Sequence, residues 1–136
     1  MNTLPIKHGL AIVLALGVLG CASKAPQLQS EQTYRVEWLG ERPLIDRSHL
    51  TLTLGADGRA HGSAGCNNWF AGYTRDGDKL GFGAVGSTRM MCAPALMEQE
   101  ARFLQSLGEI QRWDFSAEQQ LQLWPGTGQP IRLWPE

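Results

Sequence analysis

One stretch decides the fold class of this chain: Leu50-Thr-Leu-Thr-Leu-Gly-Ala-Asp-Gly-Arg-Ala-His-Gly-Ser63. Leucine and threonine alternate over residues 50–54, which is the period-two pattern of a β-strand with one buried face. The Asp57-Gly58 dipeptide then tolerates positive φ and suits a tight turn into a second strand over Arg59–Ser63. The stretch therefore predicts a β-hairpin.

Similar alternation recurs on both sides of this hairpin. An Asp-Gly turn lies between two of the later segments, and a Pro-Gly-Thr-Gly loop lies between the last two. With seven or eight short strands, this pattern predicts an antiparallel meander. The further strands are expected over Tyr34–Trp38, Phe70–Thr74, Lys79–Phe82, Leu121–Trp124 and Ile131–Trp134.

A single segment has helical periodicity instead. Between Pro94 and Leu107, apolar side chains recur at the spacing of one helix face, as at Met97, Ala101 and Leu104. Pro94 suits the first helical position, and Gly108 suits a left-handed residue that ends the helix. We therefore predict an α+β domain in which one helix, over residues 94–107, covers the open face or mouth of a β-rich curved sheet or partial barrel.

The N-terminal segment has the features of an export signal. Lys7 precedes an uncharged, mostly apolar run over Gly9–Gly20, and Cys21 follows directly. The run is too short for a transmembrane helix, which needs about 20 apolar residues. Val18-Leu-Gly-Cys21 resembles the lipobox of bacterial lipoproteins, whose cysteine is acylated and becomes the first mature residue. An ordinary signal peptide with an incidental cysteine, or a buried core helix, are the alternatives.

On this interpretation, residues 1–20 are a signal peptide, residues 21–32 form a lipidated flexible tether, and residues 33–136 form one domain. Two or more acyl chains attach a protein to a membrane stably, without a membrane-spanning segment. Because Ala22 and not Asp follows Cys21, the enterobacterial sorting rule predicts the outer membrane, with the domain facing the periplasm. The predicted partners are therefore the membrane, through the lipid on Cys21, and an envelope protein.

The composition argues against a nucleic-acid partner. The chain has 12 basic and 13 acidic residues, and neither sign forms a run. A nucleic-acid partner is therefore not expected, because phosphate recognition needs clustered positive charge. We expect a monomeric domain, with most of its five tryptophans in the core or at its rim.

Two motifs could carry chemistry, but both are weak. Gly81-Phe-Gly-Ala-Val-Gly86 has the spacing of a dinucleotide-binding loop, but no βαβ unit surrounds it, and bends or close packing explain the glycines better. His61 and Ser63 share one strand face, which allows a hydrolase hypothesis, but no Gly-x-Ser-x-Gly elbow is present. We predict no catalytic residue, cofactor or metal ion.

Two cysteines remain once Cys21 is assigned to the lipid. An even number of cysteines in an exported domain favours a disulfide between Cys66 and Cys92. Buried reduced thiols are the first alternative. A metal site is the second, although neither cysteine has the C-x-x-C spacing or the nearby histidine pair of a zinc site.

Four segments, taken in order, resemble the META domain, the family of the HslJ-like lipoproteins. The resemblance extends from about Thr33 to Trp134, and the order of the motifs is more specific than any one of them. The segments are Gly62-Ser-Ala-Gly65-Cys66-Asn67-Asn68-Trp-Phe-Ala-Gly72-Tyr73, Asp76-Gly-Asp-Lys-Leu-Gly-Phe-Gly83, Ser87-Thr88-Arg89-Met90-Met-Cys92-Ala-Pro94 and Glu98-Gln-Glu100-Ala-Arg-Phe103-Leu104.

The resemblance implies a compact β-rich domain with one helix, and it implies envelope or surface proteins associated with heat stress, antibiotic tolerance or secretion. It implies no known reaction. The family motif residues here are Gly65, Asn67, Asn68, Arg89 and Glu100. Their expected roles are structural, with ligand binding by the two asparagines as the alternative.

Two of these roles can be made specific. We expect Glu100, on an otherwise apolar helix side, to be held by Arg89 or by the hydroxyls of Ser87 and Thr88. Asn67 and Asn68 are expected to form the turn after Cys66, since asparagine tolerates positive φ.

Three function classes follow. The first is a non-enzymatic, membrane-anchored envelope lipoprotein that binds another envelope component and acts in heat or antibiotic stress. The second is a small-molecule binder whose pocket is lined by some of the tryptophans. The third and weakest is a hydrolase that uses Ser63 and His61.

Overall fold

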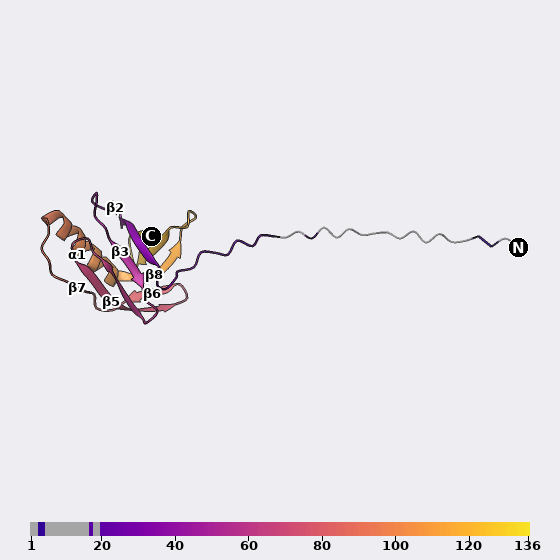
Figure 1. The fold of residues 1–136 in the computed structure, drawn as a ribbon, viewed down its shortest axis with the longest axis horizontal. Coiled ribbons are helices and arrows are strands. Elements are labelled where there is room, and N and C mark those ends of the chain that lie inside the picture. Colours follow the sequence, from indigo (N-terminus) through magenta and orange to yellow (C-terminus); the bar gives the residue numbers. More distant parts are fainter. Residues whose placement is uncertain (1–2, 5–16, 18–19) are drawn as a thin grey trace.

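A computed structural model describes residues 3–4, 17 and 20–136, so the predicted signal peptide lies almost entirely outside the described residues. The described part contains ten strands and one helix (Figure 1). The elements are β1 (Thr33–Leu39), β2 (Arg42–Pro43), β3 (Thr51–Leu54), β4 (Arg59–Ser63), β5 (Asn68–Asp76), β6 (Lys79–Phe82), β7 (Gly86–Ser87), α1 (Pro94–Glu109), β8 (Ile110–Phe115), β9 (Leu121–Pro125) and β10 (Ile131–Pro135).

Eight of the strands form a closed antiparallel barrel. Their order is β10-β9-β8-β6-β5-β4-β3-β1, and β10 pairs with β1 to close it. The two short strands β2 and β7 pair with β1 and β5 outside this circuit. The prediction of a β-rich meander with one helix is confirmed, and the sheet closes completely. In the part of the chain that the structure describes, closure leaves no long strand edge free to pair with another chain.

The leucine-threonine strand forms as predicted, but the expectation of a single buried face is wrong, because Thr51 and Thr53 are also buried, with hydroxyl groups that bond to Ser63 and Thr33 on the neighbouring strands. β3 pairs with β4 across the Asp57-Gly58 turn, with Thr53 opposite His61. The leucines of this strand point into the barrel and are fully buried. Leu50, just before the strand, is equally buried.

Trp69 on β5 is the largest side chain of the barrel interior. It is 1% exposed and makes edge-to-face contacts with Phe82 and with Phe103 of α1. Its indole N–H donates to the carbonyl of Thr51 at 2.9 Å, so its polar group is satisfied inside the core. Aliphatic side chains of β1, β3, β9 and β10 fill the remaining space.

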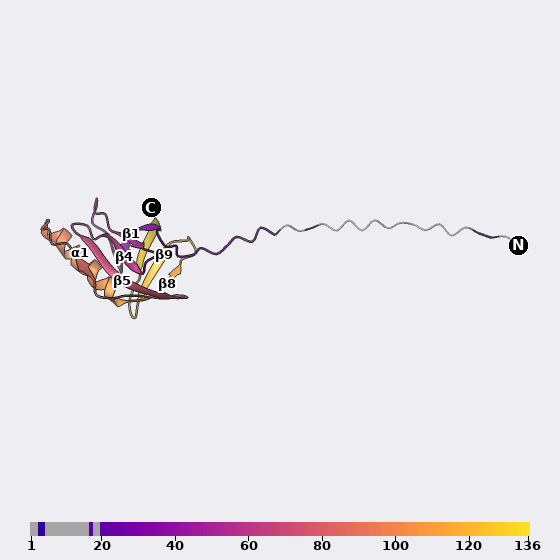
Figure 2. The same cartoon turned by 60° about the horizontal axis from the view of Figure 1, so that its bottom comes forward.

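Helix α1 packs at one end of the barrel, and residues 20–32 leave from the opposite side (Figures 1 and 2). Pro94 occupies the start of the helix, as predicted. The prediction for Gly108 is wrong, because the helix continues through Gly108 to Glu109 and Ile110 enters β8 directly in an extended conformation. Ile110 is itself buried, so core packing of β8 sets this end of the helix and no left-handed glycine is needed.

The N-terminal segment joins the barrel before β1 begins. Leu28 is 3% exposed, and its carbonyl accepts a hydrogen bond from Arg75 at 2.8 Å. The Gln29 N–H also donates to the hydroxyl of Tyr34 at 3.3 Å. Residues from Leu28 onward therefore pack on the domain, although the predicted tether runs to residue 32. Within the described ranges, no helix has the length and apolarity needed to cross a membrane.

Candidate functional site

The predicted motif residues meet at the turn between β4 and β5. The Ala64 N–H donates to the Asn67 carbonyl at 2.7 Å and closes the turn. Gly65 has a φ of 105°, a conformation that a side chain would strain. The turn points the N–H groups of Cys66 and Asn67 toward α1.

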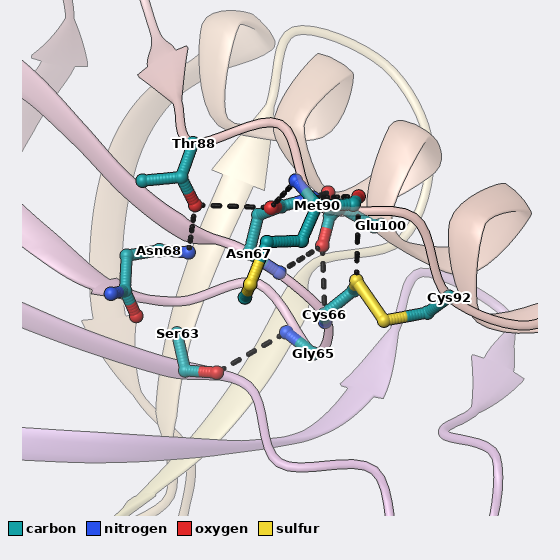
Figure 3. Close-up of a disulfide and its surroundings, with 9 residues drawn as sticks. All are labelled: Ser63, Gly65, Cys66, Asn67, Asn68, Thr88, Met90, Cys92 and Glu100. Atoms are coloured by element: carbon teal, nitrogen blue, oxygen red, sulfur yellow. Dashed lines mark hydrogen bonds between the residues drawn. A yellow bond between two sulfur atoms is a disulfide. The ribbon is translucent and has the colours of Figure 1, made fainter.

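Glu100 reaches this turn from the buried face of α1. Its side chain is 4% exposed, and Oε2 accepts from the backbone N–H of Cys66 at 3.1 Å and of Asn67 at 2.8 Å. The other oxygen, Oε1, accepts from Asn67 Nδ2 at 2.6 Å (Figure 3). A buried carboxylate is costly unless it is hydrogen bonded, and three donors serve it here.

The Asn67 side chain links this carboxylate to the segment before the helix. It is 2% exposed, and Oδ1 accepts from the Met90 N–H at 2.6 Å and from the Thr88 hydroxyl at 3.0 Å. Besides Glu100, Nδ2 also serves the Met90 carbonyl at 3.1 Å. An amide side chain has two donor and two acceptor positions, so all four are used (Figure 3).

A disulfide joins two of these segments covalently, the turn after β4 and the segment before α1. Cys66 and Cys92 are bonded, with their Cα atoms 6.0 Å apart, which confirms the predicted pair. The bond joins the turn to the residues just before Pro94. Cys21, the predicted acylation site, is exposed and has a free thiol.

The predicted partners of Glu100 are wrong. Arg89 is exposed, and the Thr88 hydroxyl binds Asn67 instead. Ser87 lies on β7, paired with Trp69. The turn's backbone N–H groups take the carboxylate because the fold brings them to α1, a contact over more than thirty residues that no local pattern reveals.

The predicted role of the asparagines is also wrong in its detail, since neither has a positive φ. Asn67 acts through its buried side chain. Asn68 is exposed, and its backbone N–H donates to the Thr88 hydroxyl at 3.1 Å, while its carbonyl accepts from the Thr88 N–H at 3.0 Å. Both residues tie β5 to the Thr88 segment.

The arrangement offers no activated nucleophile. The Ser63 hydroxyl donates to the His49 carbonyl at 2.7 Å and accepts from the Gly65 N–H at 3.2 Å. Within the described residues, no hydrogen bond joins Ser63 to His61, so no base is placed to take its proton. All four positions of the Asn67 amide are used within the protein, and the buried Glu100 carboxylate accepts three hydrogen bonds, so both groups hold the turn after β4 to α1.

The glycine-rich segment is a packing feature. Gly86 pairs with Phe70, whose ring lies where a Cβ on Gly86 would stand. Gly81 lies in β6, opposite Thr74. This agrees with close packing in a curved sheet as the explanation of these glycines.

Comparison with protein families identifies the domain, since the model of the META domain matches residues 26–136. The chain belongs to the META domain family. No curated protein matches it. The match begins two residues before Leu28, so it includes the part of the N-terminal segment that packs on the barrel.

Two solved structures share this META fold. An NMR structure of a protein from Burkholderia xenovorans is 25% identical, with a TM-score of 0.66, and the alignment covers 100% of this chain and 99% of that one. A second NMR structure is also 25% identical, with a TM-score of 0.58 and coverage of 75% and 86%. Both agree with a β-rich domain that has a single helix.

Helix α1 carries a second buried polar residue, Gln99, which was not predicted from the sequence. Gln99 is 1% exposed, and its side chain accepts from the Ile45 N–H at 2.8 Å and donates to the Ser48 hydroxyl at 3.0 Å. The sequence did contain a signal for this burial, because Gln99, Phe103 and Leu107 follow one another at intervals of four residues and therefore share one helix face. Gln99 secures the loop after β2, as Glu100 secures the turn after β4.

Proposed function

We propose that this META domain protein is a non-enzymatic lipoprotein of the bacterial envelope that binds another envelope component, with heat or antibiotic stress as its physiological setting. Its position relative to the membrane follows from the tether. Leu28 is packed on the barrel, so only six residues, 22–27, lie between it and the proposed acylation site Cys21. The seven Cα–Cα steps from Cys21 to Leu28 span at most about 25 Å when the chain is extended.

This short reach would orient the domain. Residues 20–32 leave the barrel opposite α1 (Figures 1 and 2), so an acylated Cys21 would place α1 and the Cys66–Cys92 cluster on the side away from the membrane. A partner in the periplasm would then meet this end of the domain. The packing of Leu28 on the barrel, close in sequence to Cys21, is the observation that supports this orientation.

A small-molecule site inside the barrel is less well supported. Trp69 and the aliphatic core fill the interior, whereas the other tryptophans lie partly exposed. The indole N–H groups of Trp113, Trp124 and Trp134 donate to protein oxygens of Gly77, Asp114 and Glu37. Each therefore has a structural role at the barrel surface.

In-cell cross-linking of the tagged protein, followed by isolation from the membrane, tests the proposal. The comparison is a Cys21→Ser form, which should keep its fold because Cys21 is exposed, but should lose both the membrane and the cross-linked partner. A form with ten Gly-Ser residues inserted after Lys24 keeps the anchor and lengthens the tether. It should reduce the yield of the cross-linked product if reach and orientation matter.

Recovery of one envelope protein with the anchored form alone would support a tethered binding protein. Full stress protection by the Cys21→Ser form would contradict the proposal. An Ala22→Asp form tests the membrane assignment separately, because it should shift an enterobacterial lipoprotein from the outer to the inner membrane. Unchanged fractionation of that form would contradict outer-membrane sorting.

A further inference from the structure

A cavity of about 270 Å³ opens at the rim of the barrel, away from the disulfide cluster. It lies between the C-terminal half of α1, the end of β1 and the loop that joins β9 to β10. Its walls include Leu39, Arg102, Glu109, Ile110, Thr127 and Ile131. None of these residues belongs to the group around the disulfide, which consists of Gly65, Cys66, Asn67, Cys92 and Glu100.

Arg102 is the unusual group in this wall. Its side chain is half-buried, and Nε is closed off from solvent without a hydrogen-bond acceptor. Among the described residues, its guanidinium takes part in no hydrogen bond or ion pair. By contrast, Arg112 pairs with Asp114 and lies over Trp124. Because Nε is itself covered by protein atoms, a ligand in the cavity would supply its acceptors to the terminal Nη1 and Nη2 groups of this half-buried, unpaired cation.

The other walls limit the chemistry of that ligand. The lining also includes three aliphatic side chains, those of Leu39, Ile110 and Ile131. Glu109 also lines the cavity and accepts a hydrogen bond from Gln105 at 3.3 Å, and its negative charge opposes a doubly charged anion such as phosphate more strongly than a singly charged carboxylate. The volume is just below the usual range of ligand pockets, about 300–1,000 Å³.

We propose that this cavity binds a small organic monocarboxylate with a branched apolar chain. The carboxylate accepts hydrogen bonds from the Arg102 guanidinium, whose planar fork matches its two oxygens. The apolar chain lies against the three aliphatic side chains and displaces water from them. The site does not depend on the proposed membrane anchor, so the two proposals fail independently.

Two-dimensional amide NMR of the full chain in detergent micelles tests this assignment, with isovalerate as the probe and isovaleramide as its uncharged isostere. Isovalerate should shift the amide signals of Ile110, Thr127 and Gln129 saturably. Its affinity should exceed that of isovaleramide at least about tenfold, since hydrogen bonds to charged groups are the stronger class. Arg102→Gln should weaken isovalerate to the same extent, whereas Arg112→Gln should leave its affinity unchanged.

A second variant keeps the test independent of Arg102 itself. Thr127→Trp fills the cavity from an exposed loop position and should abolish the isovalerate shifts while the rest of the spectrum stays native. Equal affinity for acid and amide, unchanged binding by either variant, or shifts confined to residues outside the cavity would each overturn the proposal. If Arg102 were purely structural, Arg102→Gln would lower the thermal midpoint, whereas an unpaired cation predicts no loss.

Discussion

Replacing Glu100 by Gln should destabilise the META domain by about 2–3 kcal/mol. The substitution conserves shape and removes one negative charge from a side chain that is 4% exposed. One glutamine oxygen can still accept from the N–H groups of Cys66 and Asn67, but without charge assistance. The new amide nitrogen then faces Asn67 Nδ2, and two buried donors oppose each other.

The surrounding groups cannot relieve this conflict by turning the Asn67 amide over. A flipped amide would offer its oxygen to the new glutamine, but it would also place its nitrogen against the Met90 N–H, which now binds Asn67 Oδ1 at 2.6 Å. One pair of donors therefore remains unsatisfied in either orientation. A buried donor without an acceptor costs about 1–3 kcal/mol, and the lost charge assistance adds to it.

Urea unfolding of the oxidised protein, followed by tryptophan fluorescence, measures the effect. The matched control is Glu98→Gln, which makes the same chemical change two residues away on the exposed face of α1. The control should stay within about 0.5 kcal/mol of the parent protein. For a domain of this size, the expected loss for Glu100→Gln corresponds to a fall in thermal midpoint of about 8–12 °C.

A swap of the two polar groups sharpens the test. In the double variant Glu100→Gln with Asn67→Asp, the glutamine amide can donate to the new carboxylate, which still accepts from Met90 and Thr88. The swap should recover about 1 kcal/mol of the loss, since only the Met90 carbonyl lacks its former donor. Equal stability of Glu100→Gln and Glu98→Gln, or a further loss in the double variant, would refute the reasoning.

Two further predictions concern the covalent and steric constraints of the fold. Replacing Cys66 and Cys92 together by Ala should lower the free energy of unfolding by about 3.5 kcal/mol, on the chain-entropy estimate for a separation of 26 residues. A reductant should lower the urea midpoint of the parent protein but should not change that of the variant. Gly62→Ala should lower the free energy of unfolding by about 3 kcal/mol in the same assay, because the new Cβ would collide with the carbonyl of Thr51. The control is Gly72→Ala, whose Cβ has open space around it. Its free energy of unfolding should differ from that of the parent protein by less than about 1 kcal/mol.

Local patterns predicted the secondary structure well where one side of an element faces the core. The alternation in Leu50–Leu54 marks the leucine side, which faces the barrel interior, because successive strand residues point to opposite faces, although the threonine side is buried as well. Pro94 marked the start of α1 for a similarly local reason. The end of α1 was missed because Ile110 is held by β8 and the core, and that contact outweighs the local preference of Gly108.

The sequence predicted which residues belong to the candidate site better than it predicted how those residues contact one another. The motif includes Gly65, Asn67, Glu100 and both paired cysteines, and the structure brings all of them together. The backbone partners of Glu100 were not predictable, because two of its three donors are backbone N–H groups, which every residue except proline carries. A sequence motif can name a side chain but cannot show which backbone groups point toward it.

The sequence by itself determined the β-rich class, the single helix, the hairpin around Asp57-Gly58 and the membership of the META family, because each depends on local periodicity or on the order of motifs. Only the tertiary structure decided that the sheet closes between β1 and β10, that Glu100 is held by the turn after β4, and that Arg102 faces a rim cavity without a partner. These features join residues far apart in the chain. Their stability depends on packing and hydrogen-bond direction in three dimensions, which no local pattern contains.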